Sequence, residues 1–253
     1  MSNGRIVYQG PSQLDGSPIV VIAIGFKSGS KNSKTGDMIQ TYILRSDMTP
    51  VEAIRSGDDA AICGDCKHRG TVADGKNTGR TCYVNTGQGP TIVFKTWLAG
   101  GYPMFTVGTD SAEGRVVRLG TYGDPAAVPV WVWTMLLRGA VGHTGYTHQW
   151  DKPGIIEDFK LLTMASADTV EEAQRAQSAG WRTFRVAMRG EEHGRRAQLR
   201  EAVCPASEEA GRVLQCHECL ACGGKATGRH GSIVIQAHGG TAVMANVNKR
   251  MAA

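Results

Sequence analysis

The seven cysteines of this sequence fall into two groups, and thiols at such short spacings are typical of metal binding. The first group contains Cys63, Cys66 and Cys82, and the second contains Cys204, Cys216, Cys219 and Cys222. Both groups lie among Gly, His and charged residues, which are unusual neighbours for core positions. The alternative is that these cysteines are buried thiols that pack as small apolar residues.

The second group has a run of three cysteines at a spacing of three, preceded by Cys204-Pro205. A single zinc ion usually takes its ligands as two separated pairs, whereas an iron–sulfur cluster offers several irons to such a run. Four cysteine ligands would make a closed site. The spacing therefore favours an iron–sulfur cluster here, with zinc as the alternative.

The first group admits two interpretations that use the same atoms. If His68 is a fourth ligand, Cys63, Cys66 and Cys82 complete a structural zinc site, which the spacing by itself favours. If His68 is not a ligand, three thiolates hold a four-iron cluster with one iron open to a substrate or cofactor. An open coordination position is what catalysis requires.

Composition indicates a globular chain with no apolar run long enough to cross a membrane and no signal peptide, so we expect a cytoplasmic protein. The formal charge of +5 is compatible with an anionic partner. The basic segments 26–36 and 189–200 are where a nucleotide or nucleic acid would bind. Phosphate loops, nucleophile elbows, Rossmann fingerprints and zinc-deaminase motifs are not found in the sequence.

The spacing of apolar runs predicts an α/β fold. Short strands at 5–8, 19–24 and 39–44 indicate antiparallel N-terminal hairpins, followed by a brief helix from Thr49 to Gly57. Beyond residue 83 helices and strands alternate. Helices are predicted at 89–98, 128–137 and 169–179, and strands at 115–119, 141–146, 159–164, 181–186 and 232–237.

This alternation predicts parallel strands in a partial (βα) barrel, with an open doubly wound sheet as the alternative. We divide the chain into residues 1–203, which contain the barrel and the first cysteine loop, and a cysteine-rich C-terminal lobe at 204–253. The polar residues Asp124, His148 and Asp151 follow predicted strands and are candidate catalytic groups, His148 as a proton relay. The alternative is that they are ordinary residues of turns and strand ends.

Several segments together resemble the phage "gene 88 protein" family. They cover about residues 33 to 224 in the same order as in that family. The segments are SKTGDMIQTYIL, ICGDC, RTCYVN, VRLGTYGDP, GYTHQW and CPASEEAGRVLQCHECLACGG.

That family is in turn similar to the radical S-adenosylmethionine enzymes, whose partial barrel carries a three-cysteine loop after its first strand. The resemblance implies that Cys63, Cys66 and Cys82 hold a [4Fe-4S] cluster whose open iron binds S-adenosylmethionine. It places Gly120, Gly123 and Asp124 near the ligand's amino group. The usual loop is Cys-x3-Cys-x2-Cys, whereas fifteen residues separate Cys66 from Cys82 here, and Asp124 stands where a Glu is typical.

The function expected from this resemblance is radical S-adenosylmethionine-like chemistry on a nucleotide or nucleic-acid base, in a phage protein of the host cytoplasm. Two alternatives belong to other classes. One is a non-catalytic zinc protein that binds nucleic acid or a host protein. The other is a zinc-dependent base-exchange enzyme with Asp124 or Asp151 as its nucleophile. The sequence carries no indication of the oligomeric state.

Overall fold

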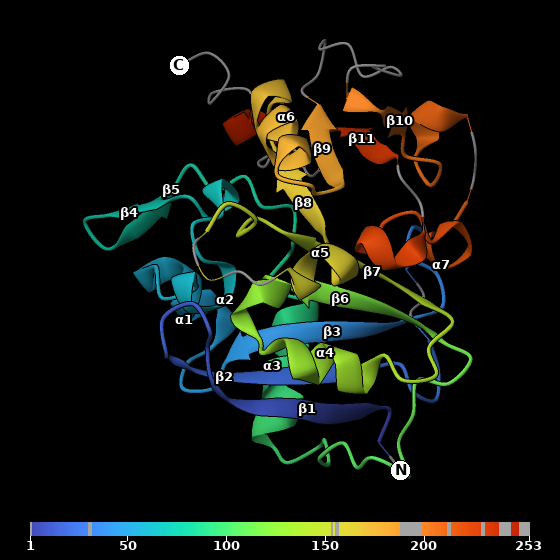
Figure 1. The fold of residues 1–253 in the computed structure, drawn as a ribbon. Coiled ribbons are helices and arrows are strands. Elements are labelled where there is room, and N and C mark those ends of the chain that lie inside the picture. The colour runs from blue at the N-terminus through green and yellow to red at the C-terminus, as the bar shows by residue number, and fades with distance from the viewer. Residues whose placement is uncertain are drawn as a thin grey trace.

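The chain folds around one large mixed β-sheet with helices on both faces (Figure 1). The computed structural model describes residues 2–29, 32–152, 154, 157–187, 199–211, 214–228, 231–237 and 244–247. The predicted basic segment 189–200 lies almost wholly outside these residues. None of the helices in the described ranges is long and apolar enough to span a bilayer.

The main sheet has nine strands in the order β1-β2-β3-β6-β7-β8-β9-β11-β10. Strands β1, β2 and β3 pair antiparallel, and every later pair is parallel. The strands are β1 (Gly4–Pro11), β2 (Pro18–Ile24), β3 (Met38–Arg45), β6 (Val116–Tyr122), β7 (Gly142–Thr147), β8 (Met164–Ala167), β9 (Thr183–Ala187), β10 (Glu201–Val203) and β11 (Ser232–Gln236). The predicted mixture of antiparallel entry strands and parallel later strands is confirmed.

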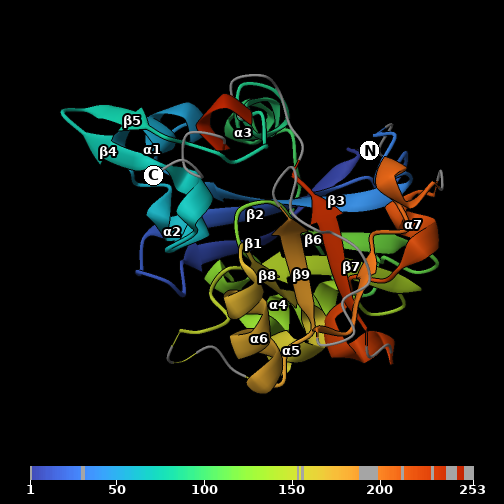
Figure 2. The same ribbon diagram turned by 90° about the horizontal axis from the view of Figure 1, so that it is seen from above.

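The helices cover the two faces of this sheet unequally. They are α1 (Pro50–Ser56), α2 (Ala60–Cys63), α3 (Gly89–Leu98), α4 (Val130–Leu136), α5 (Asp158–Leu162), α6 (Val170–Ser178) and α7 (Cys216–Cys219). Figure 2 shows α4, α5 and α6 on one face, and α1, α3 and the small hairpin β4 (Thr71–Ala73) and β5 (Lys76–Thr78) on the other. Helices α4, α5 and α6 connect the consecutive parallel strands β6, β7, β8 and β9, and crossovers of one hand place such helices on one face.

Apolar β-branched residues explain the centre of the sheet. Strand β2 is buried from Ile19 to Ala23, and such a run reads as a strand covered on both faces. Trp133 of α4 is fully buried, and it donates its Nε1–H to the Pro125 carbonyl at 3.0 Å. The indole therefore contributes apolar contact without leaving a buried donor unpaired.

Most predicted elements occur where the sequence placed them. Helix α1 begins after Thr49, whose side chain forms a capping box with Glu52, and ends before Gly57. The predicted strand at 159–164 is wrong, because residues 158–162 form helix α5 and only Met164 begins strand β8. A short apolar run does not distinguish helix from strand, and here the helix lets Phe159 reach the core while Lys160 stays near solvent.

The C-terminal part of the chain contributes directly to the sheet. Strand β11 lies between β9 and β10 and pairs in parallel with both. The division at residue 203 stays a prediction, since the strands on either side of it share this one sheet. Strands β1 and β10 are its two edges.

An ion pair with no solvent exposure joins β9 to the edge strand β10. The Arg185 guanidinium donates to Glu201 at 3.0 Å, and both side chains are 0% exposed. Because β11 lies between β9 and β10, the two side chains meet across β11 on one face of the sheet. We expect E201A to lower the free energy of unfolding by about 3–5 kcal/mol, since it removes the counter-charge of a buried arginine.

Urea denaturation measures this effect, with E157A as the matched control. Glu157 pairs with Lys160 but is 81% exposed, so its removal should change stability by less than about 1 kcal/mol. Equal effects of the two substitutions would contradict a role of the buried pair in holding β10.

Candidate metal centres

The first cysteine loop follows β3 and the short helices α1 and α2. Cys63 is the last residue of α2, and Gly64 then turns the chain with φ +55°. A Cβ atom at Gly64 would lie 2.3 Å from Oε1 of Gln149, so only glycine allows this close approach. The turn brings the backbone N–H of Cys66 to the Cys63 carbonyl at 3.2 Å.

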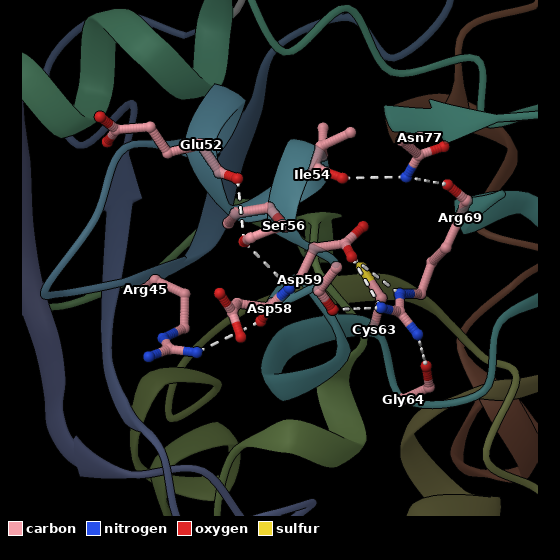
Figure 3. A network of polar contacts seen from close by, with 12 residues as sticks. Arg45, Glu52, Ile54, Ser56, Asp58, Asp59, Cys63, Gly64, Arg69 and Asn77 are labelled. Carbon is pink, nitrogen blue, oxygen red and sulfur yellow. Dashed lines mark hydrogen bonds and ion pairs between the residues drawn. The ribbon is translucent and has the colours of Figure 1, made fainter. Parts of the chain in front are cut away.

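Arg69 holds this loop in shape through contacts with Asp59 and the loop backbone (Figure 3). Its guanidinium donates to Oδ1 of Asp59 at 2.7 and 3.0 Å and to the carbonyls of Gly64 and Gly57 at 2.8 and 2.6 Å. Asp59 is 3% exposed, and burial raises its pKa while Arg69 opposes that rise. One arginine thus fixes both ends of the segment that carries Cys63.

The hairpin β4–β5 closes the long gap between Cys66 and Cys82. After the hairpin the backbone N–H groups of Thr81 and Cys82 donate to the His68 carbonyl at 3.1 and 3.0 Å. Cys82 therefore returns beside the loop although fifteen residues separate it from Cys66. The long spacing between Cys66 and Cys82 is thus occupied by the hairpin β4–β5, and Cys82 still lies beside the loop.

The three thiols of the first group are partly buried and influence one another. Burial raises the pKa of Cys63 well above its usual value, and Cys66, Asp59 and Cys82 raise it further. Burial also raises the pKa of Cys66 to about 12, although the backbone N–H of His68 donates to its sulfur. Thiols in such surroundings stay protonated unless a metal centre supplies positive charge.

The separation of the sulfurs bears on which metal group would fit. Among the described residues, three ligand atoms within 4.8 Å of one another occur in His68, His148 and Asp168, and no three cysteines form such a set. Zinc–sulfur bonds of about 2.3 Å place tetrahedral thiolates about 3.8 Å apart. A cluster of several metal ions holds its thiolates farther apart than a single zinc ion does, so this criterion does not exclude a four-iron cluster.

Polar residues follow three consecutive parallel strands at the carboxyl ends of those strands. Asp124 lies just after β6, His148 directly after β7 and Asp168 directly after β8. The carboxyl ends of parallel strands meet at one edge, which is where α/β folds place their chemistry. The interactions of Cys66 with both Asp124 and Asp168 show that the cysteine loop faces this edge.

Asp124 connects the cysteine loop to two strands. Its Oδ1 accepts from the Ala126 N–H at 2.9 Å, its Oδ2 accepts from the His148 N–H at 2.8 Å, and its own N–H donates to the Ile62 carbonyl at 2.6 Å. Burial raises the pKa of this carboxyl to about 6, against the effect of hydrogen bonds that include Thr147 and Gln149. Both oxygens are thus already engaged; a catalytic or ligand-binding role for Asp124 stays a prediction.

The candidate glycines beside Asp124 have local structural reasons. Gly123 has φ +85°, and a Cβ atom there would lie 2.7 Å from the Cβ of Ile43. At Gly120 an added Cβ would meet the Gly123 carbonyl oxygen at 2.5 Å. Close backbone packing therefore requires both glycines, whether or not a cofactor binds nearby.

His68 points toward Asp168 and does not complete a ligand set with the cysteines. Its Nε2 lies 2.9 Å from Oδ1 of Asp168, and its Nδ1 lies 2.7 Å from Oγ1 of Thr81. Hydrogen bonding and proximity to His68 lower the pKa of Asp168 to about 2, despite burial, which is the largest influence and raises it. The sequence assigned no chemistry to Asp168; its place directly after a buried strand is the signal that would have found it.

Of the other candidates, His148 lies inside this site and Asp151 lies outside it. The ring of His148 is 5.5 Å from that of His68, and burial lowers its pKa to about 4. Asp151 is exposed beside Lys152, which pairs with Asp65.

The second cysteine group gathers near the amino ends of the same strands. Figure 1 shows α7 at the opposite end of β3 and β6 from α2. The backbone N–H of Cys216 donates to the Lys34 carbonyl just before β3 at 2.8 Å, and the Cys222 carbonyl accepts from Gly145 of β7 at 3.0 Å. All four thiols influence one another, and burial raises the pKa of Cys222 to about 12.

A buried arginine anchors the loop that carries Cys222. Arg182 at the start of β9 donates to the carbonyls of Ala221 and Gly224 at 2.8 and 2.6 Å. Apolar side chains of the sheet, including Met164 and Ile233, pack against Cys204 and Cys222. Cys204 and Cys222 are therefore buried, whereas Cys216 and Cys219 are partly exposed.

Tyr83 and Arg118 lie between the two groups. Tyr83 directly follows Cys82, and its hydroxyl accepts from Nη2 of Arg118 at 3.0 Å. Burial raises the pKa of the Cys216 thiol, and the positive charge of Arg118 opposes that rise. The guanidinium on β6 thus interacts with the second cysteine group and with a neighbour of the first.

Comparisons with protein families, curated proteins and solved structures find no match to this chain. Its site is therefore interpreted from its own geometry.

Loss of Arg69 should loosen the first cysteine loop. In R69Q the carboxylate of Asp59 loses its buried counter-charge, so we expect the free energy of unfolding to fall by about 3 kcal/mol. Cys63 and Cys66 should also react faster with a thiol reagent in metal-free protein. Urea denaturation and timed thiol labelling measure the two effects.

R55Q is the matched control, because Arg55 is exposed in the last turn of α1. Its labelling rate should equal that of the unmodified protein. An R69Q protein that labels no faster would show that the loop holds its shape without this arginine.

Proposed function

We propose that this protein is an iron–sulfur enzyme with a catalytic cluster at Cys63, Cys66 and Cys82. The observation that carries the proposal is that these thiols influence one another beside the carboxyl ends of the parallel strands, and that within the described ranges His68 turns to Asp168 instead of joining them. Three thiolates leave one iron of a four-iron cluster open to a ligand. The parallel strands β3 to β11 would then form the partial barrel expected from the sequence.

We propose that the second group holds a closed cluster. The four thiols influence one another, which supports one shared site, and their run at a spacing of three favours a four-iron cluster over zinc. With every iron bound by cysteine, its role would be structural or electron transfer. Arg118 beside Cys216 would stabilise negative charge there.

The reaction class that these features support is radical chemistry with S-adenosylmethionine as the ligand of the open iron. A reduced cluster of this kind supplies one electron to a sulfonium ligand. The chain's own contribution is to hold the loop of the thiols through Arg69 and to join it to β6 and β7 through Asp124. Because both oxygens of Asp124 are engaged, we assign it a positioning role and no contact with the ligand.

The substrate class remains the one expected from the sequence, a nucleotide or nucleic-acid base. The formal charge of +5 supports an anionic substrate. The base-exchange alternative is less well supported, because its nucleophile would be the engaged Asp124 or the exposed Asp151.

Metal analysis of protein purified without oxygen and reconstituted with iron and sulfide tests the proposal. We expect about eight iron atoms per chain, four in each cluster. C66A and C219A are matched variants, each of which should lose the iron of its own group alone. Addition of S-adenosylmethionine should change the electron paramagnetic resonance of the reduced cluster in C219A and not in C66A.

Colourless protein with zinc in place of iron would contradict the proposal and support the zinc-protein alternative. An iron protein whose spectrum does not respond to S-adenosylmethionine would retain the clusters and reject this reaction class.

A further inference from the structure

Three side chains beside the first cysteine loop form a set of nitrogen and oxygen ligands. His68 comes from the loop, His148 from the end of β7, and Asp168 from the end of β8. One ligand atom from each lies within 4.8 Å of the other two. Among the described residues, no other three His, Cys, Asp or Glu side chains bring their ligand atoms within 4.8 Å of one another.

The separations suit one metal ion. Nε2 of His68 and Oδ1 of Asp168 are 2.9 Å apart. Metal–ligand bonds of about 2.1 Å place neighbouring ligands of a six-coordinate ion about 3.0 Å from each other. A metal ion bound to both atoms would replace the hydrogen bond between them while keeping about the same separation.

The groups behind the ligands hold them in a suitable orientation. Oγ1 of Thr81 lies 2.7 Å from Nδ1 of His68, which leaves Nε2 to face Asp168. The backbone N–H of Asp168 donates to Glu172 at 2.8 Å, and Glu172 pairs with Lys67. Metal-binding histidines commonly have such a partner on their second nitrogen.

His148 supplies an imidazole without a hydrogen-bond partner. Its backbone N–H donates to Asp124, whereas its ring nitrogens make no hydrogen bond to the described residues. The ring lies edge-on to His68, with the two planes at 72°. A ring nitrogen of this partly buried imidazole is therefore available to a metal ion without the loss of a hydrogen bond to the described residues.

We propose that His68, His148 and Asp168 bind one divalent first-row transition metal ion. Two imidazoles and one carboxylate select such ions over calcium and magnesium, and leave coordination positions for water or substrate. The site uses no cysteine. It therefore does not depend on iron–sulfur clusters in this protein, and it would place a Lewis acid beside the first cysteine loop.

Manganese(II) titration of the full chain tests this site, because Mn²⁺ favours nitrogen and oxygen ligands over thiolates. The electron paramagnetic resonance signal of free Mn²⁺ counts the bound ions. We expect one tightly bound ion per chain, lost in H148A and in D168N. T81V removes no ligand but frees Nδ1 of His68, so it should weaken binding about 10–100-fold.

H143Q and C66A are the controls and should bind Mn²⁺ as the unmodified protein does. His143 lies in β7, the strand that His148 directly follows, but the ring of His143 contacts the Leu162 carbonyl at 3.0 Å. Circular dichroism checks the folding of each variant; if D168N unfolds, H148A and T81V decide the result. Unchanged binding in folded H148A, loss of binding in C66A, or no binding by the unmodified protein would overturn the proposal.

Discussion

The arrangement of the residues around the first cysteine loop depends on the hydrogen bonds of the buried Asp124. It accepts hydrogen bonds from the turn after β6 and from the backbone at the end of β7, while the Asp124 N–H holds the carbonyl that precedes Cys63. A charge in such a place is tolerated only because several donors surround it. These donors belong to the turn after β6 and to the segment that carries His148. The N–H of Asp124 adds the bond to the segment that carries Cys63, so one residue joins the three segments of the site.

The parallel sheet separates two chemical environments along its strands. Cys63, Cys66 and Cys82 lie at the carboxyl ends, where loops are irregular and polar residues can face a ligand. Cys216 lies near the amino end of β3, and Cys222 packs under apolar side chains in a loop anchored by Arg182. The two cysteine groups thus lie in different surroundings of the same sheet.

Regular elements were predictable where local patterns were strong. The Thr49 cap, the apolar run of β2 and the acidic first turn of α6 each reflect physics that acts within a few residues. The segment 159–164 was mistaken because its apolar residues fit both a helix and a strand, and packing of Phe159 decided between them. Strand β10 was missed because three residues carry too little pattern and a buried ion pair holds it.

The sequence by itself determined that thiols gather in two groups and that strands and helices alternate, because spacing and periodicity are properties of the chain alone. Only the tertiary structure decided that a hairpin returns Cys82 to Cys66, and that His68 faces Asp168. These contacts join residues that are tens of positions apart. The direction of a side chain across such a distance depends on strand order and burial, which no local pattern encodes.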